Sequence, residues 1–190
     1  MPSFDLRNIN IAEYQRKGTT VTYGTPESIG DAMSCNLELR FAEGRLYAES
    51  RLAEFVKKAT GGTISVAVKY IPQSAQSLMY GAQTKTRNEA TGLAYTAKDV
   101  SKYVGVSFFA PDMIDSVEKF TCVFVPKAMF GPPSMSYQTK GDSIQFNTPT
   151  TTGEFLADDT DAQTLLETAV CDTEEAARTW CKSVLGVVGA

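Results

Sequence analysis

The stretch YVGVSFFAPDMIDSVEKFTCVFVPKAMF, residues 103–130, decides the fold of this chain. It holds two apolar runs, 103–110 and 117–130, and between them a Pro111-Asp112 step that is typical of a turn. Along the second run, bulky side chains alternate with smaller apolar ones, so both faces of the expected strand are apolar. This pattern predicts a central strand with one layer of structure packed on each side.

Other segments alternate with a period of two, which indicates a mainly β fold. Residues 34–41 place apolar and thiol side chains on one face and polar ones on the other, and residues 63–71 repeat the pattern. The Gly61-Gly62 step before the second segment predicts the turn of a hairpin. Residues 51–59 fit a helix or a strand, and their place before this turn favours a strand.

Prolines and a further alternating segment follow the central stretch. Pro126, Pro132 and Pro133 are expected to end strand pairing, because proline has no N–H to donate. Residues 143–150 then predict one more strand. The core is predicted to contain Leu37, Leu39, Val66, Val68, Phe120, Phe124, Ile144, Phe146 and Trp180.

Two helices are expected. A short one begins at Ser74 as N-cap and stops at Gly81, and a C-terminal one spans 172–186, with Asp172 as its cap and an apolar stripe that includes Trp180. Residues 82–102 are polar and aperiodic, which predicts a long surface loop. Residues 162–170 are undecided between helix and strand.

These elements fit a single domain over residues 1–190, in which residues 1–18 form an N-terminal arm. The fold class is mainly β (α+β), an antiparallel β-sandwich or barrel with one short internal helix and a C-terminal helix. No apolar run approaches the roughly 18 residues of a membrane span, and the start lacks the apolar block of a signal peptide, so we expect a cytoplasmic protein without membrane contact.

Composition narrows the possible chemistry. The chain has no histidine, which excludes Ser-His-Asp and Cys-His nucleophiles and histidine zinc sites. No phosphate-binding glycine loop or calcium loop occurs. The four cysteines are widely spaced, which favours reduced, mostly buried thiols, with one structural disulfide as the alternative. We therefore expect no enzyme activity, no cofactor and no metal.

Charge argues against tight binding of nucleic acid, since the net charge is −4. Residues 142–177 hold nine acidic residues and no Lys or Arg. This segment is either a solvated acidic face or a surface that repels a polyanion or pairs with a basic neighbouring subunit.

The order of several segments resembles the major tail proteins of long-tailed, non-contractile bacteriophages. The resemblance covers residues 20–186 and includes GTPESIGDAMSCNLELRF, RLYAESRLAEF, GGTISVAVKYIPQSAQSLMYG, YVGVSFFAPD and EEAARTWCKSVLG. Its most telling part is KFTCVFVPKAMFGPPSMSYQTKGDSIQFNTPTTTGEF, residues 119–155. Ser50 stands where the family pattern has a second acid after LYAE.

The resemblance implies a tail-tube subunit, similar in fold to the Hcp tube proteins of type VI secretion. Such subunits form hexameric rings that stack into a hollow tube for genome delivery in the virion tail, after assembly in the host cytoplasm. The expected partners are further copies of the chain, a ruler protein, a tail terminator, and genomic DNA that passes through the lumen unbound. Subunit contacts are predicted, from polarity and loop length, at Tyr14, Tyr47, Glu49, Arg51, Tyr95, Lys98 and Asp99.

Two other interpretations stay open. One is another phage or secretion part, such as a tail terminator or a decoration protein, which would form single rings or monomers. The other is a ligand-binding β-sandwich module or an unrecognised enzyme, which would need a pocket with convergent polar groups and acids of shifted pKa.

Overall fold

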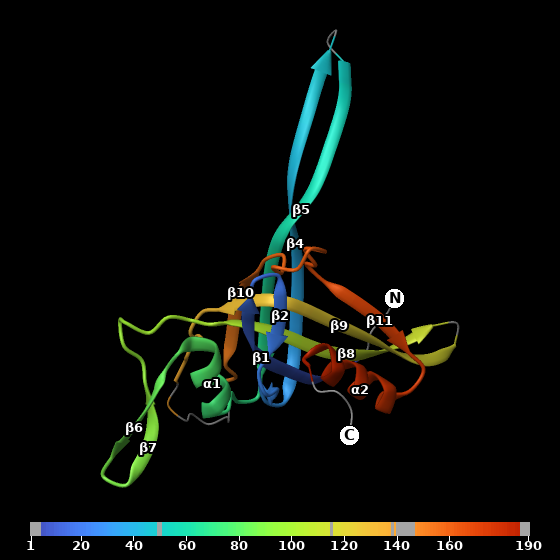
Figure 1. Ribbon diagram of the computed structural model, residues 1–190. Helices are drawn as coiled ribbons and strands as arrows, with labels where there is room; N and C mark the ends of the chain where they lie inside the picture. The colour runs from blue at the N-terminus through green and yellow to red at the C-terminus, as the bar shows by residue number, and fades with distance from the viewer. Residues whose placement is uncertain (1–4, 49–50, 115, 138, 140–146, 187–190) are drawn as a thin grey trace.

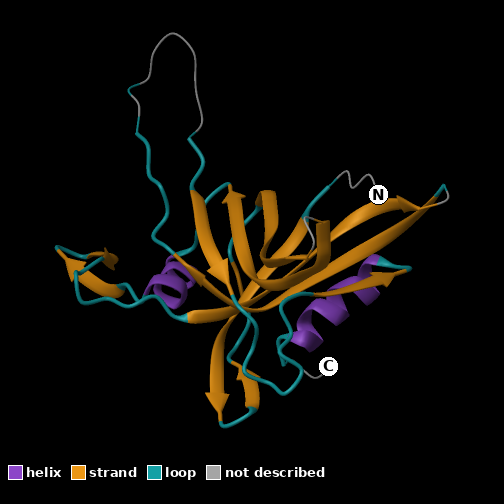
Figure 2. Cartoon of the chain, turned by 90° about the horizontal axis from the view of Figure 1, so that it is seen from above, coloured by secondary structure: helices purple, strands orange, loops and turns teal. Residues whose placement is uncertain are grey.

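The computed structural model describes residues 5–48, 51–114, 116–137, 139 and 147–186. Strands dominate it, and two helices lie at separate places on the strands (Figures 1 and 2). The strands are β1 (Arg7–Lys17), β2 (Thr20–Tyr23), β3 (Glu27–Ser28), β4 (Ala32–Ala48), β5 (Arg51–Val68), β6 (Gln83–Arg87), β7 (Ala90–Ala94), β8 (Tyr103–Ile114), β9 (Val117–Phe130), β10 (Thr150–Phe155) and β11 (Glu167–Cys171), and the helices are α1 (Gln73–Tyr80) and α2 (Glu174–Val184).

One antiparallel sheet forms the body. Its strand order is β2-β1-β8-β9-β10-β5-β4, with β3 paired to β1 and β11 paired to β9. Buried side chains from β1, β8, β9, β10 and β5 all meet in one core, so the sheet must curve around that core. Helix α1 adds Ala75, Met79 and Tyr80 to the same core. The predicted mainly β, antiparallel fold with two short helices is confirmed.

The central strands β8 and β9 are covered on both faces, as their apolar pattern predicts. On one face Val106 and Val125 enter the main core. On the other face Phe109 and Phe120 pack against helix α2, with ring centroids 6.0 Å apart. Because both faces of this strand pair are covered, its sequence lacks the alternation of apolar and polar residues that a half-exposed strand shows.

Helix α2 begins one residue later than predicted. The Thr173 side chain caps it by accepting a hydrogen bond from the Ala176 N–H at 3.2 Å. Asp172, the predicted cap, instead accepts a hydrogen bond from the Lys119 Nζ at 2.6 Å. The prediction was wrong because a threonine in the extended conformation next to it fits the cap position.

Helix α1 also begins differently. Pro72 occupies its N-cap position without a side-chain bond, and Ser74, the predicted cap, lies inside the first turn. Proline suits this boundary because it disfavours a helical backbone conformation at the residue before it, and because it has no N–H group that needs a partner. Gly81 ends the helix in the left-handed region at φ 70°, as expected.

The hairpin of β8 and β9 turns later than the sequence indicates. Pro111 and Asp112 are inside β8, opposite Phe120 and Lys119, and pairing continues to the end of the strand at Ile114. Pro111 lies past Phe109, the last β8 residue whose pairing with β1 is described, and proline is found in strands that have an open edge. Asp112 accepts a hydrogen bond from the Thr121 hydroxyl.

Pro126 does not end β9. The register shifts between Val104 and Val106, so that Pro126 and Lys127 together lie opposite Gly105. This is a β-bulge, a place where a strand accommodates proline without losing a regular ladder bond. The strand therefore continues to Phe130.

The Gly61-Gly62 step is not a turn. Strand β5 runs through it without interruption, and the interpretation of residues 51–59 as a strand is confirmed. A Cβ on Gly61 would lie 2.6 Å from the Phe155 carbonyl oxygen, and one on Gly62 would overlap both the Glu38 carbonyl oxygen and the Phe155 ring. The glycines are needed here for close approach of β10.

The structure also corrects two predictions and decides a third that was left open. Residues 7–17, part of the expected arm 1–18, form β1 inside the sheet, because Ile9 and Ile11 are completely buried. Residues 82–102 contain the hairpin of β6 and β7, which closes at Asn88 and Glu89 with positive φ, before a loop that follows. The undecided segment 162–170 leads into strand β11.

The residues predicted to form the core differ in how deeply they are buried. Val66, Val68, Phe120 and Phe124 are buried, while Leu37 and Trp180 are half-buried against the cores. Leu39 is 42 % exposed, because β4 leaves the body near this residue. Ile144 and Phe146 lie outside the described residues, as do residues 143 and 145. In the rest of the predicted strand 143–150, residues 147–149 are not in a strand and Thr150 begins β10.

We expect Gly62→Ala to lower the free energy of unfolding by about 3 kcal/mol, because the new methyl group overlaps Phe155 and the β4 backbone. Urea unfolding measures the change. Gly44→Ala is the matched control, since a Cβ at Gly44 meets nothing within 4 Å and should cost no stability. Equal stability of the two variants would contradict the close packing.

Candidate functional site

The most distinctive surface is a projecting arm, which we define as residues 41–59. Its strands are the outer halves of β4 and β5, and it extends far from the rest of the molecule (Figure 1). Apart from the half-buried Ala59, each of its side chains with described burial is exposed. A register shift at the base, between Arg40 and Phe41, leaves Thr60 as an extra residue in β5. A bulge of this kind bends and twists a strand pair where it leaves a sheet.

One face of the arm carries aromatic and charged side chains that contact each other. The Lys57 ammonium lies 4.5 Å from the Phe41 ring centroid and 3.1 Å from a Glu43 carboxylate oxygen. The Arg45 guanidinium lies 5.5 Å from the Phe55 centroid. These cation–π contacts and ion pairs hold the two strands together without a core beneath them.

The opposite face of the arm is open, and it exposes two aliphatic side chains beside the charged residues Glu54 and Lys58. Val56 is 63 % exposed and lies opposite Gly44, while Leu46 is 58 % exposed and lies opposite Glu54. An isolated two-stranded hairpin is marginally stable in water, and apolar side chains on it gain most when a second surface covers them. This face can therefore act as a contact surface.

The outer edge of β4 is a second candidate surface. β4 ends the strand order, so within the described part of the chain its outer edge has no strand partner along 17 residues. Its unpaired N–H and C=O groups can accept another strand by β-augmentation. The same strand thus supplies one side of the arm and a free edge.

A polar cluster fastens the loop after β10 to the body. The Asp159 carboxylate accepts hydrogen bonds from the Tyr14 hydroxyl at 2.8 Å, from Lys127 at 2.6 Å and from Arg16 at 3.0 Å. The hydrogen bonds from Lys127 and Tyr14 hold the pKa of Asp159 below its usual value. Partial burial raises the pKa of Tyr14 to about 12, so its hydroxyl stays a donor.

Several acids of the segment 142–177 have basic partners elsewhere in the chain. Besides Asp159, the residues Glu154, Asp172 and Glu174 pair with Arg40, Lys119 and Arg7 respectively. Part of this acidic segment therefore stabilises the fold through ion pairs.

The predicted contact residues lie in three separate places. Tyr47, 62 % exposed, and Arg51 are on the arm, and Glu49 lies outside the described residues. Tyr14 is in the body, where its ring packs against Tyr23 and Tyr103. In the sequence the apolar residues of 51–59, Phe55 and Val56 among them, are spaced as in a helix, so this pattern does not predict an exposed arm.

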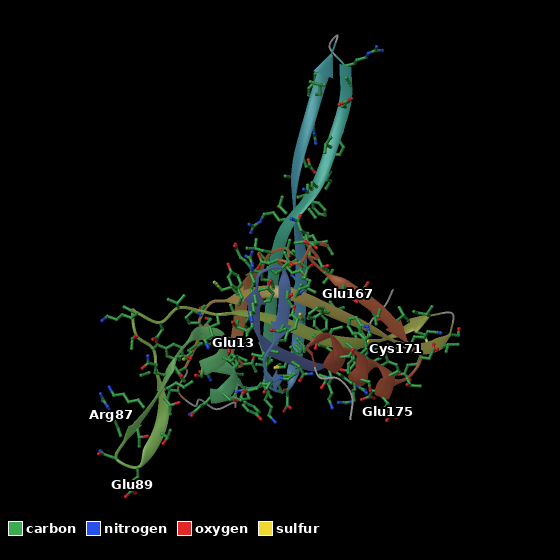
Figure 3. All side chains as sticks on the ribbon, in the orientation of Figure 1. Glu13, Arg87, Glu89, Glu167, Cys171 and Glu175 are labelled. Atoms are coloured by element: carbon green, nitrogen blue, oxygen red, sulfur yellow. The ribbon has the colours of Figure 1, made fainter. Side chains whose placement is uncertain are left out.

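Tyr95, Lys98 and Asp99 are in the loop that follows β7. The Tyr95 hydroxyl donates to the Gln76 side chain at 2.6 Å, and Asp99 accepts from the backbone and hydroxyl of Thr96 at 2.7 Å each. The neighbouring hairpin of β6 and β7 carries Arg87 and Glu89 at its end, away from the body (Figure 3). This hairpin and loop form a second projection.

A cavity of about 260 Å³ lies between residues 69–76, 133–137 and 147–149. Lys69, Tyr70 and Tyr137 are among its lining residues, and the described part of the lining includes no carboxylate and no thiol. No group of three or more acidic or thiol side chains that could hold a metal occurs among the described residues. Within the same residues, no helix is long and apolar enough to cross a membrane.

Comparison with known protein families finds no matching family model, and comparison with curated proteins finds no match.

We expect Asp159→Asn to destabilise the protein at neutral pH, because Lys127 and Arg16 lose their carboxylate. Since the folded-state pKa of Asp159 is lowered, its contribution is present above the unfolded value of about 3.9 and is lost as pH falls through the folded value. Chemical unfolding of both proteins from pH 7 downward should show a constant difference above about pH 5 that shrinks as the pH falls below about 4. Asp161→Asn, on the exposed side of the same loop, is the control and should change little.

Proposed function

We propose that this chain is a structural subunit of a bacteriophage tail tube, which assembles into stacked rings of six subunits that conduct the genome. The observation that carries the proposal is the projecting arm, which exposes Leu46 and Val56 on one face and has no second layer among the described residues. Together with the resemblance in residues 20–186, it supports a protein whose role is contact between copies.

Two surfaces of the same chain suit this assembly. The free edge of β4 can pair with a strand of the next subunit in a ring, which joins the sheets of neighbours through backbone hydrogen bonds. The arm can reach an adjacent subunit and bury Leu46 and Val56 there. In the proposed assembly the edge and the arm each contact a different surface on the neighbour, and repetition of such contacts closes a ring or extends a stack.

The charge of the chain suits a conduit for DNA. With a net charge of −4, a wall built from many copies repels phosphates and does not retain them. In this role the chain is not an enzyme, and its partners are further copies, a ruler protein and a tail terminator in the virion tail. DNA passes through without specific binding.

Electron microscopy of the purified protein at high concentration tests the proposal. Long tubes of stacked rings support a tube subunit, and single rings support a tail terminator. A monomer at all concentrations would contradict both assignments.

We expect the double substitution Leu46→Lys and Val56→Lys to abolish tubes, or to raise the protein concentration required for them at least tenfold. Each charge would have to be buried in the contact, and 1.4 kcal/mol corresponds to a factor of ten. Sedimentation and negative-stain imaging measure the assembly.

The control for this variant is Leu46→Ile with Val56→Ile, which keeps both side chains apolar and should assemble as the wild type does. Thermal unfolding of the monomer should be almost unchanged in both variants, because the side chains are exposed in the single chain. Normal tubes from the lysine variant would show that the arm is not the contact.

A further inference from the structure

Two cysteines from neighbouring strands nearly touch. The sulfur of Cys122 on β9 lies 3.7 Å from the sulfur of Cys171 on β11. In the register of these antiparallel strands, Cys122 lies opposite Ala169, two residues from Cys171. Their side chains therefore share one face of the sheet, on the side covered by helix α2.

The two thiols differ in their access to solvent. Cys122 is completely buried, whereas Cys171 is half-buried and lines an open groove between β11 and α2 with Glu175 and Trp180. Cys171 and Glu175 are labelled at this end of the molecule in Figure 3. A small reagent can therefore reach Cys171 first, with Cys122 directly beneath it.

The other two thiols are less reactive. Burial raises the pKa of Cys181 to about 11 and that of Cys35 to about 12. Burial also raises the pKa of Cys122 well above its ordinary value. Because the thiolate is the nucleophile, these three thiols react slowly. Cys171 is the favoured point of first attack because it is open to the groove, and Cys122 reacts only when a partner is held next to it.

We propose that Cys171 is a site of oxidative modification, and that Cys122 resolves it to a disulfide that links β11 to β9. The oxidant is a low-molecular-weight disulfide such as oxidised glutathione. The Cys171 thiolate attacks one sulfur of this disulfide, forms a mixed disulfide and releases one glutathione thiolate. The Cys122 thiolate then attacks the Cys171 sulfur and releases the second, so that two protein thiols are oxidised and one glutathione disulfide is reduced to two thiols.

The local structure permits the bond. The sulfur atoms must approach from 3.7 Å to about 2.05 Å. β11 can supply this movement because it is a five-residue strand that pairs only with β9 among the described strands. The bond would fasten β11, and the start of α2 that follows it, to the centre of the sheet.

The test uses the full chain, incubated with oxidised glutathione, then alkylated and analysed by mass spectrometry. The expected product has lost two hydrogens and yields one cross-linked peptide pair that contains Cys122 and Cys171. Its Tm should exceed that of the reduced protein by several degrees, because the bond closes a loop of about 50 residues in the unfolded chain.

Variants assign the roles. Cys171→Ser should prevent the cross-link, and Cys122→Ser should stop the reaction at a stable glutathione adduct on Cys171. Cys35→Ser is the matched control and should form the cross-link as the wild type does. Cys181→Ser, which removes the other thiol in contact with Cys122, should form it too. If Cys122→Ser fails to fold, the Cys171→Ser result and the peptide pair decide the question alone.

A link between Cys122 and Cys181, first modification at Cys35, or no cross-link although alkylating reagents reach Cys171 would each overturn the proposal. The reaction is measured on the single chain, so its outcome is independent of whether the chain assembles into tubes.

Discussion

The close contact between β5 and Phe155 is the constraint on which the rest of the structure depends. Gly61 and Gly62 let the backbone of β5 pass against the carbonyl and ring of Phe155, which is itself almost completely buried. On one side of this contact β5 belongs to the core through Val66 and Val68. On the other side β5 and β4 leave the body and form the arm. One pair of glycines thus divides a single strand into a core half and an exposed half.

The exposed half is possible because its stability does not come from a core. Cation–π contacts and ion pairs across one face hold the strands together, while the other face keeps its apolar side chains in water. In the body the central hairpin of β8 and β9 has the opposite character, since both of its faces are packed. This contrast between a fully covered centre and an uncovered projection favours a subunit that completes its packing with other copies.

The two proposals use different parts of the molecule. Assembly depends on the arm and the free edge of β4, whereas the thiol chemistry depends on β9, β11 and helix α2. The Asp159 cluster is part of neither proposal's surface and has a structural role, because it fastens the loop after β10 to β1 and β9. The acidic segment that contains Asp159 therefore contributes both internal ion pairs and the negative charge that suits a conduit for DNA.

The sequence alone determined the local properties of this protein. Alternation along 117–130 predicted a strand covered on both faces, Gly81 predicted the end of a helix, and the absence of histidine excluded several kinds of catalysis. Tertiary structure decided where pairing continues: through Pro111, through Pro126 at a bulge, and through Gly61-Gly62 beneath Phe155. It also decided that Leu39 is exposed and that two distant cysteines meet. Proline and glycine show only where the backbone is able to turn. The partner strand across the sheet determines whether the chain turns there or continues.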